Sequence, residues 1–143
     1  MGDRLTLRTY FDGSCGPRNP GGVAAYGFLI RDEAGDIIHS SSGRLGSGPE
    51  FTNNVAEFGA LYQAMLWVHH HYPEAHVVFY GDSSLVVAIM RGEARAKKGK
   101  YLAYYQKTIQ LAKPYLAKQQ WRFQWIQRAL NHEADELAQY YRF

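Results

Sequence analysis

Residues 5–15 read LTLRTYFDGSC, and the other predicted elements follow from this segment. Apolar or small side chains alternate with more polar ones, which is the period of a strand with one face on a core. The side chains expected on that face are Leu5, Leu7, Thr9 and Phe11. The strand runs into Asp12, and residues 13–22 are rich in Gly, Pro and Asn, so we predict a turn there.

Outward from this strand, the same patterns predict the remaining elements. Strands over 23–31 and 36–44 flank a turn at 32–35 and complete an antiparallel meander. Helical spacing starts near Asn54 and stops before Pro73, and a short strand follows over 76–80. A helix over 83–90, a basic connection over 92–100 and a second helix over 101–118 come next. A strand over 121–127 follows. The last helix is capped by Asn131 and reaches Tyr141.

This order predicts an α/β fold. Strands that are joined through helices usually lie parallel and are connected by right-handed crossovers, so we expect a mixed sheet with helices on its faces. The length suits a single domain over residues 1–143. Sites in such sheets lie beyond the carboxyl ends of strands, which is where the sequence puts Asp12 and Asp82.

Composition narrows the class of function. The net charge of +3 and a pI of about 9.0 favour a polyanionic partner such as a nucleic acid. Cys15 is the only cysteine, which excludes an internal disulfide framework and a thiolate zinc site. Neither a signal-peptide pattern nor an apolar run of membrane-spanning length is present, so we expect a cytoplasmic protein that is not bound to a membrane.

Four carboxylates are the candidate chemical groups. Asp12 and Asp82 follow strands, Glu57 is expected in the first turn of one helix, and Asp135 near the start of another. Oxygen-only ligands suit Mg²⁺ or Mn²⁺, whereas zinc normally requires His or Cys. Two such ions about 3.5 to 4 Å apart can activate water at a phosphodiester. Each residue also has a structural alternative, as a turn residue or a helix-dipole partner, and spacing alone does not show convergence.

Four ordered motifs resemble those of the type 1 ribonucleases H. They are YFDGSC (residues 10–15) with NPGG (19–22), TNNVAE (52–57), GDS (81–83) and ADELA (134–138), and together they cover nearly the whole chain. The short length and Arg128 near Asn131 are similar to the archaeal-like members of the family.

The resemblance implies a five-stranded mixed sheet with helices on both faces. It also implies that Asp12, Glu57, Asp82 and Asp135 bind two Mg²⁺ or Mn²⁺ ions when substrate is present. The expected reaction is endonucleolytic cleavage of the RNA strand of an RNA–DNA hybrid, leaving a 5′-phosphate and a 3′-hydroxyl.

Several residues match family positions that contact nucleic acid. Thr52 and Asn53 match contacts to the DNA strand, and Asn19 and Asn54 match positions that read the minor groove. Readout there is by shape and the 2′-hydroxyl, so sequence preference should be weak. Helix capping is the alternative for Asn53 and Asn54. Two further candidates are Cys15 and Ser84. Cys15 either approaches the RNA backbone or is simply a packed residue. Ser84 replaces a frequent Gln, so we expect one RNA contact to be lost or shortened.

Two departures from the family pattern concern basic and histidine side chains. The basic handle of many members is reduced to Arg91, Arg95, Lys97, Lys98 and Lys100, without tryptophans. Many members also carry a mobile His before the last Asp, and we predict that Arg128 replaces it. The alternatives are an ordinary surface Arg, or a role for His132, which we expect to be an exposed first-turn residue.

Two other clusters are interpreted structurally. His69, His70 and His71 point in different directions on a helix, so we predict a solvated helix end and no metal site. Trp121, Trp125 and most tyrosines are assigned to packing. The rival functions are a hybrid-binding module without catalysis and another nuclease or transposase on this fold. We expect a monomer that needs no protein partner, while metal preference and action on double-stranded RNA stay open.

Overall fold

The computed structural model describes residues 5–97 and 99–140, and its centre is one sheet of five strands in the order β3-β2-β1-β4-β5. The strands are β1 (Thr6–Gly16), β2 (Val23–Arg31), β3 (Ile37–Ser47), β4 (His76–Gly81) and β5 (Trp121–Trp125). β2 pairs antiparallel with β1 and β3, whereas β4 pairs parallel with β1 and β5. The predicted five-stranded mixed sheet is therefore confirmed.

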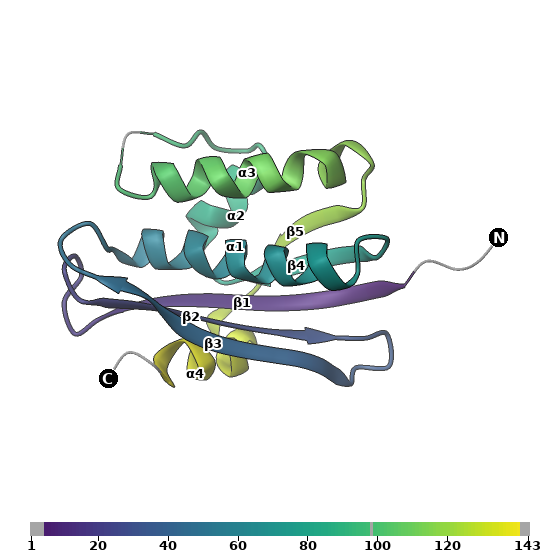
Figure 1. The fold of residues 1–143 in the computed structure, drawn as a ribbon, viewed down its shortest axis with the longest axis horizontal. Coiled ribbons are helices and arrows are strands. Elements are labelled where there is room, and N and C mark those ends of the chain that lie inside the picture. The colour runs from purple at the N-terminus through teal and green to yellow at the C-terminus, as the bar shows by residue number, and fades with distance from the viewer. Residues whose placement is uncertain (1–4, 98, 141–143) are drawn as a thin grey trace.

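Helices cover both faces of the sheet, as predicted (Figure 1). On one face lie α1 (Asn53–His71), α2 (Ser84–Met90) and α3 (Leu102–Ala117). A short 3₁₀ turn, η1 (Arg128–Asn131), leads into α4 (His132–Tyr140) on the other face. Tyr141, the predicted end of the last helix, lies outside the described residues. Across residues 5–97 and 99–140, no helix is both long and apolar enough to cross a membrane.

The prediction of a turn over residues 13–22 is wrong at its beginning. β1 continues to Gly16 because Gly13 to Gly16 pair with residues 23–26 of β2, and this pairing outweighs the low strand propensity of glycine. The parallel ladder between β1 and β4 nevertheless ends at Tyr10 and Tyr80. Asp12 and Asp82 each lie two residues beyond that ladder, at one edge of the sheet.

The core that holds this edge lies between the sheet and the helices α1 and α3. Its largest fully buried side chains include Phe11, Phe58 and Phe79. On the opposite face, α4 packs directly on β2, because a Cβ at Gly27 would lie only 2.4 Å from the backbone nitrogen of Ala138. The small residue therefore brings α4, which carries Asp135, close to the strands that carry the other carboxylates.

Candidate active site

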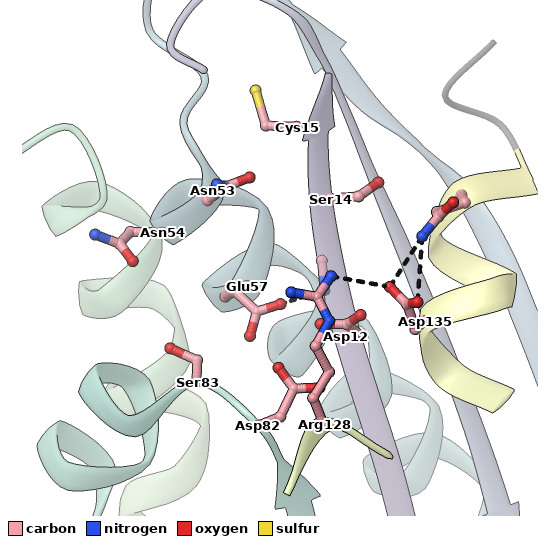
Figure 2. A pocket seen from close by; sticks show the side chains of 12 residues that line it. Asp12, Ser14, Cys15, Asn53, Asn54, Glu57, Asp82, Ser83, Arg128 and Asp135 are labelled. Atoms are coloured by element: carbon pink, nitrogen blue, oxygen red, sulfur yellow. Dashed lines mark hydrogen bonds and ion pairs between the residues drawn. The ribbon is translucent and has the colours of Figure 1, made fainter. Parts of the chain in front are cut away.

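Three of the four predicted carboxylates converge at the sheet edge. One oxygen from each of Asp12, Glu57 and Asp82 lies within 4.8 Å of the others. Asp12 and Glu57 are buried, with 4% and 6% of their surface exposed, and Asp82 is half-buried. The three line a cleft of about 330 Å³, and Asp135 faces them from α4 but lies outside the 4.8 Å group (Figure 2).

Gly13 is what lets Glu57 reach Asp12. A Cβ at this position would lie 2.2 Å from the carbonyl oxygen of Ala56, so only glycine permits β1 and α1 to approach so closely. The Gly13 N–H donates to Glu57 Oε1 at 2.5 Å. Thr52 caps α1 by accepting from Val55 N at 3.1 Å, which places Glu57 in the second helical turn. The prediction that Glu57 lies in the first turn is therefore wrong, and its stabilising partner is a strand amide.

Asp82 is held by groups from the segment that leads into α4. Asn131 Nδ2 donates to Asp82 Oδ2 at 2.9 Å, and Trp125 Nε1 donates to the Asp82 carbonyl at 3.1 Å. The prediction that Asn131 caps the last helix is wrong, because a cap accepts through its side-chain oxygen and Asn131 Oδ1 has no hydrogen-bond partner. The sequence contains no local signal for this contact, because Asn131 and Asp82 are 49 residues apart.

Asp135 lies in the first turn of α4, as predicted. Gln139 Nε2 donates to its two carboxylate oxygens at 3.1 and 3.2 Å, and Arg128 Nη2 lies 3.6 Å from Oδ1. The side chain of Arg128 is 76% exposed and extends across the cleft (Figure 2). Sequence reasoning missed Gln139, although its spacing of four residues from Asp135 is a known helical pairing.

The electrostatics of the site fit a divalent cation. Burial raises the pKa of Asp12 far above its ordinary 3.8, and the nearby carboxylates of Glu57, Asp82 and Asp135 raise it further. Burial also raises the pKa of Glu57, to about 7, although contacts with Asp12 and Gly13 counteract it. Glu57 Oε2 is buried without a hydrogen-bond partner. Oxygen-only donors with excess negative charge and an unpartnered oxygen match the needs of Mg²⁺ or Mn²⁺.

The predicted nucleic-acid contacts are divided between the cleft and its surroundings. Cys15, Asn53 and Asn54 line the cleft, as does Ser83, which was predicted only to start a helix. Asn19 lies beside the cleft, where its Oδ1 accepts from the backbone N–H of Asn53 at 3.0 Å. Ser84 lies outside, in a neighbouring groove with Trp125.

The predicted exposure of the histidine and tryptophan side chains is correct for some of these residues and wrong for others. His132 is exposed, as expected, and its Nδ1 lies 3.3 Å from the carbonyl oxygen of Ala129. His70 and His71 are exposed, but His69 is half-buried and its Nδ1 lies 2.5 Å from the Tyr115 hydroxyl, so the prediction of a fully solvated helix end is wrong there. Trp121 is buried as predicted, whereas Trp125 is 47% exposed.

The reduced basic handle is only partly free to bind a ligand. Arg91 donates to the carbonyl of Phe123 and pairs with Glu93, and Lys100 donates to the carbonyl of Pro49. Lys98 lies outside the described residues. Arg91, Arg95, Lys97 and Lys100 are all exposed, so the described part of the handle keeps its charge at the surface, and Glu93 offsets only that of Arg91.

Comparisons with known proteins identify the class. The model of the reverse transcriptase-like family matches residues 10–141. The structure of ribonuclease H1 from the halophilic archaeon Halobacterium salinarum superposes with a TM-score of 0.80 at 26% identity, covering 94% of this chain and 95% of that one. LC11-RNase H1, solved in complex with an RNA/DNA hybrid, superposes with a TM-score of 0.79 at 30% identity, and the match covers 92% of each chain.

A third neighbour is the N-terminal ribonuclease H domain of a Mycobacterium tuberculosis protein, with a TM-score of 0.80 at 27% identity, covering 94% of this chain and 91% of that one. The chain therefore belongs to the reverse transcriptase-like family. The predicted recognition as a type 1 ribonuclease H is confirmed, and the archaeal neighbour agrees with the predicted likeness to archaeal-like members.

Proposed function

We propose that the chain is an endonuclease that hydrolyses the RNA strand of RNA–DNA hybrids and leaves a 5′-phosphate and a 3′-hydroxyl. The observation that carries this proposal is the convergence of Asp12, Glu57 and Asp82 at an open cleft in a protein of this family. The hybrid bound to LC11-RNase H1 supports the substrate class.

Asp12, Glu57 and Asp82 would hold the metal ions, with Asp135 contributing from the opposite wall. When bound, two Mg²⁺ or Mn²⁺ ions would supply an activated water and stabilise the leaving oxygen of the phosphodiester. The protein contributes rigid placement, because Asp12 and Glu57 lie on β1 and α1 and are almost fully buried. Without a cation these crowded carboxylates repel one another and favour protonation, so a bound divalent cation would displace the protons and relieve the repulsion.

The rest of the cleft suits a nucleic-acid duplex with A-like geometry. Asn53, Asn54 and Cys15 line the cleft on the side of α1 and β1, where polar groups can read the minor groove and the 2′-hydroxyls. Arg128 extends over the cleft with a permanent charge, so it can stabilise phosphate charge but cannot act as a base near neutral pH. We assign Thr52 and Asn53 to the DNA strand, Asn19 and Asn54 to the minor groove, and Ser84 to a peripheral contact.

The remaining expectations complete the proposal. The chain would work as one ribonuclease H domain and as a monomer that needs no protein partner. The single unpaired Cys15 supports a reducing, cytoplasmic location.

Cleavage of labelled duplexes tests the proposal. An RNA–DNA hybrid, a DNA duplex and an RNA duplex of one sequence are incubated with Mg²⁺, Mn²⁺ or EDTA, and the new ends are analysed. We expect the hybrid to be cut far faster than DNA, in metal only, with 5′-phosphate ends. Binding without cutting would instead support a non-catalytic module, and equal cutting of the DNA duplex would support a general nuclease.

A further inference from the structure

Asn131 connects two of the elements that carry carboxylates. Its Nδ2 donates to Asp82 Oδ2 and to the carbonyl of Phe11, both at 2.9 Å. Phe11 directly precedes Asp12 in β1, and Asp82 follows β4. The side-chain amide of Asn131 therefore binds both the backbone next to Asp12 and the side chain of Asp82.

The same residue also connects to the fourth carboxylate. Asn131 ends the 3₁₀ turn η1, and Asp135 lies four residues further on, in the first turn of α4. Because α4 starts at the next residue, the position of Asn131 fixes where this helix begins relative to β1 and β4. Asn131 thus relates Asp12, Asp82 and Asp135 to one another.

Only one end of the buried Asn131 amide has hydrogen-bond partners. Both partners of Nδ2 are acceptors, which fixes the orientation of the amide. The residue is only 1% exposed, and its Oδ1 is buried without a partner. The cost of burying the unpartnered Oδ1 offsets much of what the two Nδ2 hydrogen bonds contribute, so the net gain in stability from this residue is small.

We propose that Asn131 is a positioning residue that orients the Asp82 carboxylate for metal binding. This inference rests on the proposed function, because it assumes that Asp82 is a metal ligand. Hydrogen bonds to a ligating carboxylate hold it in the binding orientation, and removing such a partner typically weakens metal affinity or activity about 10- to 100-fold.

Gln120 provides a matched control at the other end of the sheet. It is also a buried amide, 5% exposed, and its Nε2 lies 3.0 Å from the carbonyl of Pro73 and 3.5 Å from that of Ala75. It touches none of the carboxylates that line the cleft. Asn131→Leu and Gln120→Met both remove an amide at nearly constant shape, but only the first removes a hydrogen bond to a carboxylate that lines the cleft.

The experiment measures the Mg²⁺ concentration that gives half-maximal hybrid cleavage, and the Mg²⁺ concentration that gives half of the metal-induced rise in Tm without substrate. We expect Asn131→Leu to raise both by about 10- to 100-fold, with hybrid affinity in EDTA retained. Gln120→Met should lower Tm in EDTA and leave both Mg²⁺ concentrations unchanged. A folded Asn131→Leu protein with the wild-type Mg²⁺ requirement would overturn the proposal.

A second measurement uses the wild-type chain and does not depend on how the variants fold. In a Mg²⁺ titration followed by NMR, the side-chain NH₂ signals of Asn131 should shift with the same midpoint as the backbone amides of Asp12 and Asp82, while those of Gln120 stay in place. Stationary Asn131 signals beside shifting Asp82 would contradict the inference. If the wild-type chain neither binds Mg²⁺ nor cuts the hybrid, the proposed function fails instead.

Discussion

The two sides of the cleft are built differently. Asp12, Glu57 and Asp82, the carboxylate triad, come from β1, α1 and the end of β4, and the first two are at most 6% exposed. Arg128 and Asp135, the outer pair, lie 3.6 Å apart, with side chains 76% and 23% exposed. Exposed ion pairs contribute only about 0 to 1 kcal/mol, so the outer pair can rearrange at little cost.

This difference separates two tasks. The core fixes the carboxylate triad before any ligand arrives, which suits groups that must hold charge at defined positions. The outer pair is positioned by a short turn and by Gln139, which suits a group that follows the substrate or product. We therefore expect the triad to determine whether cleavage occurs and the outer pair to determine how fast it proceeds.

The largest effect is expected in the triad. Asp12→Asn and Asp82→Asn each remove a charge that is needed to hold the metal ions, and loss of several kcal/mol of charge stabilisation lowers the rate by at least about 1,000-fold. Folding, checked by circular dichroism, should be preserved, and hybrid binding can survive. Near-wild-type cleavage by either folded variant would remove the metal site from the account.

A smaller effect is expected in the outer pair. Arg128→Ala removes one positive charge that faces the substrate, so kcat should fall by about 10- to 100-fold. This loss is at or below the smallest usually found when a group that stabilises transition-state charge is removed. Because the side chain is exposed, hybrid affinity should change less than kcat does. Steady-state kinetics and hybrid binding in EDTA measure the two quantities, and an equal loss in both would assign Arg128 to binding.

The two buried carboxylates of the triad, Asp12 and Glu57, should also make the metal-free protein sensitive to pH. A carboxyl group whose pKa is raised on folding stabilises the fold while it is protonated, and this contribution is lost as pH rises through the raised value. The pKa values of Asp12 and Glu57 are raised above their ordinary 3.8 and 4.5. In EDTA, Tm should therefore fall between about pH 4 and pH 8.

Asp12→Asn should weaken this dependence and raise Tm at neutral pH by about 3 °C for each kcal/mol of repulsion relieved. Mg²⁺ should stabilise the wild-type chain more than the variant, because a ligand that binds only the folded state raises its stability. Thermal melts across pH, with and without Mg²⁺, measure both effects. If the Tm of the wild-type chain in EDTA rises between about pH 4 and pH 8, the pKa values of Asp12 and Glu57 are not raised by folding, and this prediction is contradicted.

The smallest effect is expected for His132, which is exposed and does not line the cleft. His132→Ala should change kcat by less than about twofold, as most exposed substitutions change energies by at most about 0.5 kcal/mol. The same kinetic assay applies. A severe loss in His132→Ala beside a silent Arg128→Ala would reverse the roles assigned to these two residues.

The sequence predicted the parts of the structure that depend on local pattern. Alternation along residues 5–11 and the helical spacing after Asn54 identified β1 and α1, because each pattern reports which face is buried. The four motifs supplied the carboxylates, three of which the structure brings together. Asp135 was placed correctly on its helix, but it lies outside the 4.8 Å group.

What the sequence did not predict depends on contacts between distant segments. Gly13 was assigned to a turn from its type, yet its place in β1 is set by pairing with Tyr26 and by contact with α1. Asn131 was assigned to a cap from its neighbours, yet its partner Phe11 lies 120 residues away. Local propensity cannot report such contacts, because only the assembled sheet creates them.

The most direct test of the account is where metal ions bind. Crystals of the wild-type chain and of Asp12→Asn, each with an RNA–DNA hybrid whose cleavage is blocked, are soaked in Mn²⁺ and examined by anomalous scattering. We expect manganese peaks beside Asp12, Glu57 and Asp82 in the wild-type protein, and weakened or missing peaks in the variant. A hybrid-bound wild-type structure without manganese at the triad would contradict this prediction.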